Sequence, residues 1–325
     1  MMEYIKINLQ LFAEMNTNVT GDLGLSVENK TFYDMTLIDE AQAELVHDKF
    51  GQKRPIPKNG GKKIEFRKFA ALPKALTALT EGVTPDGKKL NVTAIEAEVS
   101  QYGDYIVQSD VLELTSIDNT IVEATKILGR QAGLTLDTIT RNVLQSGTNV
   151  FYCPKSDGTK VESRATLDNT CKLNVATVKR VAAFLKKNNA PKIDGSYVGI
   201  IHPYAAHDLM ADPEWIDAHK YAQPENLYEG EIGRIAGIRF VETSEAYVVD
   251  GVYCTLIMGA NAYGVTDITG GGLQTIIKQK GSAGTADPLD QRSSIGWKAM
   301  KTAEILIDPY LVRVESKSDF DIENN

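Results

Sequence analysis

The four histidines are too scattered to form a recognisable zinc or acid–base site. They are His47, His202, His207 and His219. None belongs to an HExxH sequence, in which two histidines on one helical face bind zinc. His202 and His207 are five residues apart, which does not put them on one helical face. We therefore expect surface or hydrogen-bonded histidines instead of metal ligands.

Glycine, serine and acidic motifs give no better evidence of chemistry. Gly230, Gly233 and Gly237 do not fit GxGxxG, and the sequence has no GxxxxGK[ST] phosphate loop. The glycines at 270–272 precede a predicted strand, which favours a hairpin or bulge. No serine lies in GxSxG, and no acidic cluster has the spacing of a calcium loop. The sequence therefore predicts no catalytic, cofactor-binding or metal-binding residue, and no enzyme.

The three cysteines indicate core packing instead of cross-linking. Cys153, Cys171 and Cys254 are far apart, odd in number and without a CxxC pair. This disfavours a disulfide framework or a zinc site and fits a reducing cytoplasm. Cys254 lies in an apolar run and is predicted to be a small core residue.

Positive charge is concentrated in one part of an otherwise acidic chain. The net charge is −8, yet residues 49–89 carry eleven Lys and Arg residues against three Asp and Glu residues, so the remainder carries −16. A solvated loop, an arm lying on an acidic surface of a sister copy, and a nucleic-acid contact all remain open. The last is weakened because no Trp, Tyr or His accompanies the basic residues for base stacking. The candidate inter-subunit contacts here are Lys62, Lys63, Arg67, Lys68, Lys88 and Lys89.

The size and hydropathy of the chain fit a soluble protein of about two domains. It has 325 residues, of which 42% are hydrophobic and 24% charged. No run of about 20 apolar residues predicts a membrane span, and the first residues do not resemble a secretory signal.

The first 108 residues are predicted to be extended. Residues 1–30 are rich in turn formers and follow a short apolar anchor that includes Leu11 and Phe12, two further contact candidates. A helical pattern at residues 31–50 ends at Gly51. Residues 52–108 then form two alternating runs around a polar tip, as expected of a long hairpin. Because an isolated two-stranded hairpin is marginal in water, we expect sister copies to cover it.

The rest of the chain is predicted to be α+β. An apolar stripe from Ile117 to Val143 predicts a long helix, in which Gly129 and Gly133 indicate a bend or, alternatively, a close approach of another backbone. A second helix is predicted from Asn174 to its end at residues 188–191. Strand-like runs occur at 197–201, 237–241, 252–258, 273–278 and 303–314, and a short helix opens at His202-Pro203.

This order of elements resembles the major capsid proteins of tailed phages, which have the Hong Kong 97-type fold, and in particular a subgroup from phages of Gram-positive bacteria. The resemblance spans nearly the whole chain. It is carried by INLQLFA (7–13), GKKIEFRKFAAL (61–72), LTEGVTPDGKKLN (79–91), QYGDYIVQSDVLELTSID (101–118), VGIIHPYAAHDL (198–209), GEIGRIAGIRFVETS (230–244), GANAYGVTDITG (259–270) and WKAMKTAEILIDPYLVRVES (297–316).

The resemblance implies a capsid shell protein with a defined set of parts. They are an N-terminal arm (1–30), an N-terminal helix (31–51), an extended hairpin loop (52–108), a peripheral domain with a spine helix (109–173), an axial domain (174–280), and peripheral-domain strands with a C-terminal tail (281–325). The short arm departs from relatives that carry their own scaffolding segment, so the resemblance implies a separate scaffolding protein. No lysine–asparagine pair for an inter-subunit cross-link is identifiable.

The implied partners are sister copies in hexamers and pentamers, a portal, and packaged DNA bound without sequence specificity. Assembly is expected in the host bacterial cytoplasm, without a membrane and without cofactors. The acidic bulk of the chain is expected to keep DNA from adhering to an interior wall. Two alternatives remain: an encapsulin-like nanocompartment shell of the same fold, and a cytoplasmic hydrolase whose catalytic residues are dispersed.

Overall fold

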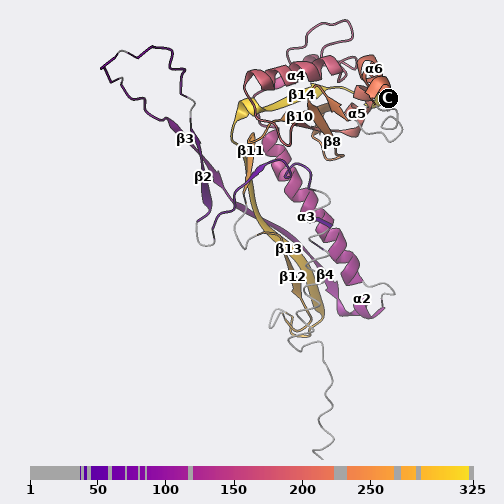
Figure 1. Cartoon of the computed structure of the whole chain (residues 1–325). Helices are drawn as coiled ribbons and strands as arrows, with labels where there is room; N and C mark the ends of the chain where they lie inside the picture. The colour runs from indigo at the N-terminus through magenta and orange to yellow at the C-terminus, as the bar shows by residue number, and fades with distance from the viewer. Residues whose placement is uncertain are drawn as a thin grey trace, which may run out of the picture.

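A computed structural model describes residues 37, 40–41, 45–57, 61–69, 72–79, 81–84, 86–115, 120–222, 233–266, 272–282 and 287–321 of the chain. Its described strands form three sheets. Figure 1 shows an elongated body with a compact end, a long tapering end and a hairpin that projects away from both. The α+β class expected from the sequence is confirmed.

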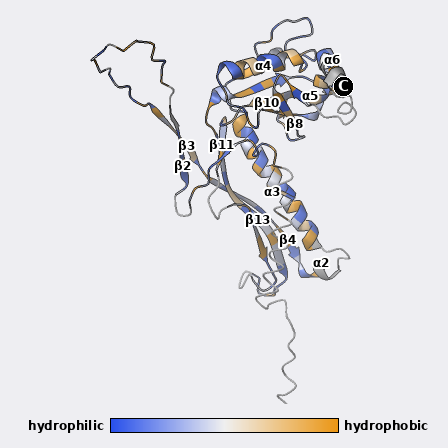
Figure 2. Ribbon diagram, viewed as in Figure 1, coloured by the Kyte–Doolittle hydropathy of each residue, from blue (hydrophilic) through white to orange (hydrophobic). Residues whose placement is uncertain are grey.

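The tapering end is a twisted sheet covered on one face by a long helix. Its strands are β1 (Gln52–Lys53), β4 (Ser100–Ser109), β11 (Tyr263–Thr266), β12 (Gln274–Lys278) and β13 (Arg292–Ile305). The helix is α3 (Thr120–Leu144), preceded by the short α2 (Asp110–Thr115). Leu128, Ala132 and Leu136 of α3 pack on Ile295 and Trp297 of β13, which buries the predicted apolar stripe. Figure 2 shows hydrophobic and hydrophilic residues alternating along α3, as an amphipathic helix requires.

The compact end is a second sheet with three helices packed around it. Its strands are β5 (Val150–Tyr152), β6 (Tyr197–Ile201), β7 (Arg234–Ile235), β8 (Ile238–Glu242), β9 (Val248–Val249), β10 (Val252–Met258) and β14 (Leu311–Ser316). Its helices are α4 (Val175–Lys187), α5 (Pro203–Met210) and α6 (Pro213–Ala222). Short 3₁₀ turns lie at Arg164–Thr166, Asp308–Tyr310 and Asp319–Asp321. Every residue of β6 and β10 is buried, as their apolar sequences predict.

Several predicted elements are found where the sequence placed them. Asn174 caps α4 by accepting a hydrogen bond from the backbone N–H of Thr177. His202 likewise caps α5, with Pro203 in the first turn. Cys254 is 2% exposed within β10, and burial raises the pKa of its thiol to about 11. The predicted core role of Cys254 is therefore confirmed.

Two predicted runs are divided in the structure. The run at 303–314 is not one strand, because β13 ends at Ile305 and a 3₁₀ turn containing Pro309 separates it from β14. The second run of the predicted hairpin is also divided. Only its first part, β3 (Val92–Glu98), pairs with β2 (Lys63–Phe69), whereas β4 pairs with β13 along ten residues. The projecting hairpin is therefore shorter than the sequence indicated.

The glycines of α3 allow the N-terminal helix to pack closely on it. A Cβ atom at Gly133 would lie 2.5 Å from the carbonyl oxygen of Ala41, and one at Gly129 would lie 2.8 Å from that of Leu37. The sequence favoured a bend at these glycines, but the packing gives them the alternative role, a close approach of another backbone. Leu37 and Ala41 are helical and buried, and residues 1–30 lie outside the described chain.

Candidate assembly surfaces

The described part of the hairpin packs on the body of its own chain at its base. Phe66 and Ala97 are buried there, and the Phe66 ring lies where a Cβ atom at Gly264 would come within 2.9 Å of it. Further along, the two strands pair antiparallel as far as Phe69 and Val92. Figure 1 shows the tip standing clear of the rest of the molecule. None of the described residues outside the hairpin covers its tip, and its cover by sister copies stays a prediction.

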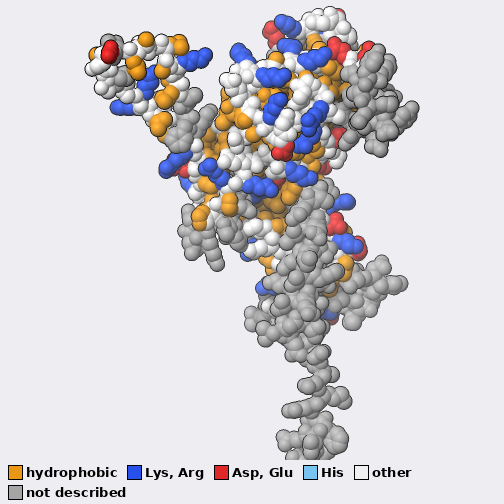
Figure 3. Space-filling model, in the orientation of Figure 1, with side chains coloured by type: hydrophobic (Ala, Val, Ile, Leu, Met, Phe, Trp, Pro, Cys, Tyr) orange, Lys and Arg blue, Asp and Glu red, His pale blue; other side chains and the backbone are white. Residues whose placement is uncertain are grey.

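The tip exposes more apolar surface than a free loop normally does. Leu76 is 86% exposed and Leu79 76% exposed, and neither contacts a hydrophobic core. Figure 3 shows hydrophobic side chains beside Lys and Arg side chains at the end of the hairpin. Contiguous apolar patches of this kind mark interaction sites. The other large apolar side chains exposed at the tip are Leu72, Val83, Leu90 and Val92.

The structure separates the predicted basic contact residues into two groups. Lys63 lies 3.5 Å from Glu96 and Arg67 lies 3.2 Å from Glu65, so these cations of β2 are paired within their own hairpin. Lys62 is exposed just before β2, and Lys68 lies in β2 opposite Thr93. Leu11 and Phe12 fall outside the described residues.

Lys88 and Lys89 form the second group. Both are exposed at the tip, and neither forms an ion pair with another described residue. They are therefore the predicted basic residues best placed to contact another molecule.

The segment just before the hairpin is held by buried polar contacts. The carboxylate of Asp137, in the middle of α3, accepts hydrogen bonds from the backbone N–H groups of Val46 (2.9 Å) and His47 (2.7 Å). Its second oxygen lies 2.6 Å from Nδ1 of His47, and both side chains are buried. Because these N–H groups bind the carboxylate, the chain turns at His47–Phe50 instead of continuing as the predicted helix to residue 50.

An ion pair joins this segment to β13. The ammonium group of Lys301 binds Asp48 and also donates to the carbonyl oxygen of Leu136, 2.8 Å away. Thr140 donates to the other oxygen of Asp48, and Tyr263 donates to the carbonyl oxygen of His47. Burial lowers the pKa of Lys301 and raises that of Tyr263. We call His47, Asp48, Asp137 and Lys301 the clasp.

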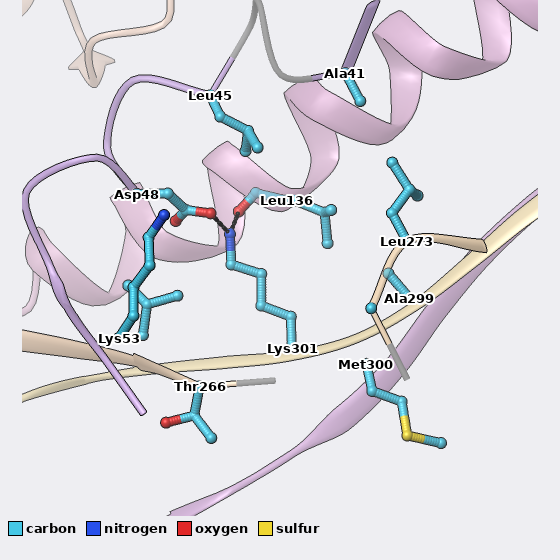
Figure 4. Close-up of a pocket in the computed structure, with 12 residues that line it drawn as sticks. Ala41, Leu45, Asp48, Lys53, Leu136, Thr266, Leu273, Ala299, Met300 and Lys301 are labelled. Atoms are coloured by element: carbon cyan, nitrogen blue, oxygen red, sulfur yellow. Dashed lines mark hydrogen bonds and ion pairs between the residues drawn. The ribbon is translucent and has the colours of Figure 1, made fainter. Parts of the chain in front are cut away.

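The clasp borders a cavity of about 370 Å³ between the N-terminal segment, α3 and β13. Figure 4 shows its polar end at Asp48, Lys53 and Lys301, and its apolar end at Leu273 and Ala299. No sequence motif predicted the clasp, because its bonded partners are up to 253 residues apart. The one sequence feature that could have indicated the clasp is that its polar residues stand among apolar neighbours.

The described residues contain neither a metal-ligand cluster nor a membrane-spanning helix. In that part of the chain, no three His, Cys, Asp or Glu side chains are grouped to hold a metal ion. None of the described helices is long and apolar enough to cross a membrane. His47 is a buried, paired core residue, and His202 is a helix cap, as expected of hydrogen-bonded histidines.

Comparison with protein families gives one match. Residues 109–278 match the model of a family described as phage capsid protein, and this region includes α3 and most of the compact end. A search of curated proteins finds no match.

Solved structures with a similar fold include two phage capsids. The capsid of cyanophage P-SCSP1u superposes with a TM-score of 0.67 at 14% identity, covering 85% of this chain and 89% of that one. The capsid of Ralstonia phage GP4 gives 0.61 at 14% identity, covering 84% and 88%. A virus-like particle from Pyrococcus furiosus gives 0.51 at 11% identity, covering 88% and 99%. At these identities the likeness concerns the fold.

Proposed function

This chain belongs to a family of phage capsid proteins and is a shell-forming major capsid protein of the virion, and from that premise we propose that its projecting hairpin joins sister copies in an icosahedral shell. The observation that carries the proposal is the exposure of the tip leucines, which the described residues leave uncovered. A sister copy offers the same surface at every position of the shell, so each contact is repeated by symmetry. Individually weak contacts then sum to a stable particle.

The remaining parts take the roles implied by the sequence. The sheet with α3 forms the peripheral domain, and the compact end forms the axial domain around the fivefold and sixfold vertices. The bounds expected from the sequence (109–173 with 281–325, and 174–280) shift accordingly, because β11 and β12 pair in the α3 sheet whereas β5 and β14 belong to the compact sheet. For residues 1–30, which lie outside the described residues, we propose the role expected from the sequence, contact with a neighbour through Leu11 and Phe12. The shell encloses double-stranded DNA and is assembled in the host cytoplasm with a separate scaffolding protein and a portal.

The second candidate is a nanocompartment shell that stores cargo enzymes. The likeness to the Pyrococcus furiosus particle favours it at the level of fold, at 11% identity. The genes beside this one distinguish the two functions: portal and terminase genes indicate a phage, and a cargo enzyme indicates a compartment.

Removing the tip tests the proposal directly. Because Phe69 pairs with Val92, joining them through Asn-Gly closes a two-residue hairpin turn without changing the register. The shortened chain should keep the thermal midpoint of the wild-type monomer and form no closed shells in negative-stain electron microscopy. Normal particles from this variant would contradict the proposed role of the hairpin.

Charge reversal at the tip tests the electrostatic part. Lys88→Glu with Lys89→Glu should weaken assembly, more strongly at low salt than at high salt. The control is Lys63→Glu, since Lys63 is already paired with Glu96 in its own hairpin. Assembly that is equally affected at all salt concentrations would remove the electrostatic part and leave the apolar part standing.

A further inference from the structure

The stretch around α4 is the most one-sidedly charged part of the described compact end. Residues 172–192 contain six Lys and Arg residues and no Asp or Glu. Lys172 pairs with Asp319, and Lys179 pairs with Glu214. The other four cations form no ion pair with a described residue, and they are Arg180, Lys186, Lys187 and Lys192.

The fold turns these cations outward. Val178, Val181 and Leu185 of α4 are fully buried, whereas Arg180, Lys186 and Lys187 are exposed. From residue 180 to 187 the helix advances about 10 Å, at roughly 1.5 Å per residue. Figure 3 shows Lys and Arg side chains gathered over this helix.

Helix stability explains only part of this pattern. Lys186 and Lys187 lie in the last turn of α4, where positive charge offsets the helix dipole. Arg180 lies in the middle of the helix and Lys192 lies beyond its end, so the dipole accounts for neither. Arg180 lies over the ring of Phe151 and Lys192 over that of Tyr197, contacts that orient the two side chains and leave their charges without a counter-ion. Four cations facing solvent in a chain of net charge −8 therefore call for an anionic partner.

The chemistry of the surface favours a nucleic-acid backbone over a protein. Within the described residues, none of the large exposed hydrophobic side chains falls between 172 and 192. Protein interfaces are anchored by buried apolar and aromatic side chains, which this face does not offer. Phosphate contacts need only Lys and Arg. Because Phe184 is partly buried and no other aromatic residue lies on α4, base stacking is not available either, which favours duplex over single-stranded DNA.

We propose, on the basis of the shell role proposed above, that Arg180, Lys186, Lys187 and Lys192 contact the phosphate backbone of the packaged duplex. This places the outer face of α4 on the interior wall of the shell. It also reverses locally the expectation that an acidic wall repels the genome. The contact is independent of base sequence and dependent on salt.

A binding assay on the unassembled chain tests the contact without requiring a shell. The probe is a fluorescently labelled random-sequence duplex, followed by anisotropy over a range of salt concentrations. Replacing Arg180, Lys186 and Lys187 by Gln should reduce affinity roughly ten- to a hundredfold at low salt and lower the slope of log K against log salt by about 2 to 3.

The matched control removes the same charge from the hairpin tip, at Lys74, Lys88 and Lys89. It should leave duplex binding within about twofold of the wild-type value. Equal losses in the two triple variants would show that only net charge matters and would overturn the proposal. Unchanged binding in the α4 variant would overturn it as well.

Labelling of filled particles tests the placement. Ala183 is exposed on the same helix, and the three native cysteines are buried, so Ala183→Cys supplies one accessible thiol. A polyethylene-glycol maleimide too large to enter the shell should label this thiol in opened particles and not in intact ones. Labelling of intact particles would put α4 outside, where an acidic protein becomes the better partner, and would overturn the proposal while leaving the shell-forming role of the hairpin intact.

Discussion

Residues 45–53 and the hairpin that follows them differ in where their polar and apolar groups lie. The first segment forms buried polar contacts with the rest of its chain: His47 and its partner Asp137 in α3 are at most 1% exposed, and Lys301 of β13, which binds Asp48, is 5% exposed. The hairpin tip does the opposite, with Leu76 86% exposed in solvent. A protein that works as a monomer would be more stable with the apolar groups buried and the charged groups exposed, because burial of apolar groups stabilises the fold and burial of charge is costly.

The comparison indicates that the two regions have different roles: residues 45–53 stabilise the monomer, and the hairpin tip binds other copies. Buried ion pairs have demanding geometry, so the clasp fixes one path for the segment that leads into the hairpin. Apolar side chains make less specific contacts, but their burial contributes more free energy. They therefore suit a surface that becomes buried when a sister copy binds. The expected consequence is that clasp substitutions change the stability of the monomer, whereas tip substitutions change assembly.

The largest effect is expected at Asp137. Asp137→Ala leaves buried His47 and two backbone N–H groups without their acceptor, so the free energy of unfolding should fall by about 3 to 5 kcal/mol in urea denaturation. Asp86→Ala, at the exposed tip, serves as the control and should change it by about 0.5 kcal/mol or less. Similar losses in the two variants would erase the contrast between the regions.

The second effect concerns the other half of the clasp. Lys301→Met leaves Asp48 without its buried cation and should cost about 3 kcal/mol. Adding Asp48→Leu should restore stability to within about 1 kcal/mol of wild type or exceed it, because an apolar pair avoids the cost of burying charge. A double variant no more stable than Lys301→Met would show that the ion pair itself holds the segment.

The pH dependence of the same pair has a defined sign. Burial lowers the pKa of Lys301 in the folded chain from its usual 10.5. Between the two pKa values the unfolded chain binds the proton and the folded chain does not, so wild type should gain stability relative to Lys301→Met as pH rises toward 10.5. Parallel pH profiles for the two proteins would contradict the lowered pKa.

A smaller effect is expected where α3 meets the N-terminal helix. Gly133→Ala gains about 1 kcal/mol in helix propensity but places a Cβ atom 2.5 Å from the carbonyl oxygen of Ala41, at a cost of about 1 to 3 kcal/mol. The net change should be a loss of about 2 kcal/mol or less in thermal denaturation. Gly87→Ala, which has open space around it, is the matched control. A stabilised Gly133→Ala variant would favour a bend, with no need for close packing.

Local patterns predicted the elements, and long-range contacts decided the rest. The caps at Asn174 and His202 and the apolar strand β10 could be read directly, because each depends on neighbouring residues. The clasp could not, since its partners meet only in the folded chain. The hairpin was predicted too long because β3 and β4 have the same alternating pattern, and only pairing with β13 separates them. The basic face of α4 was visible as six cations without an acid, but its exposure depended on the packing of the opposite face.

The smallest effect on stability is expected at the tip, where the effect on assembly should be greatest. Leu76→Asp alters a side chain that no described residue covers, so the free energy of unfolding of the monomer should stay within about 0.5 kcal/mol of the wild-type value. The same substitution places a charge in the contact that is proposed to be buried between sister copies. Because burial of an unpaired charge is costly, electron microscopy should show no closed shells. Thr77→Asp, at the next position of the same exposed loop, adds the same charge without removing an apolar group and should retain more assembly. If both variants form equally few shells, the added charge and not the lost leucine decides assembly. If Leu76→Asp also destabilises the monomer, the tip packs on its own chain, and the contrast between the tip and the clasp is wrong.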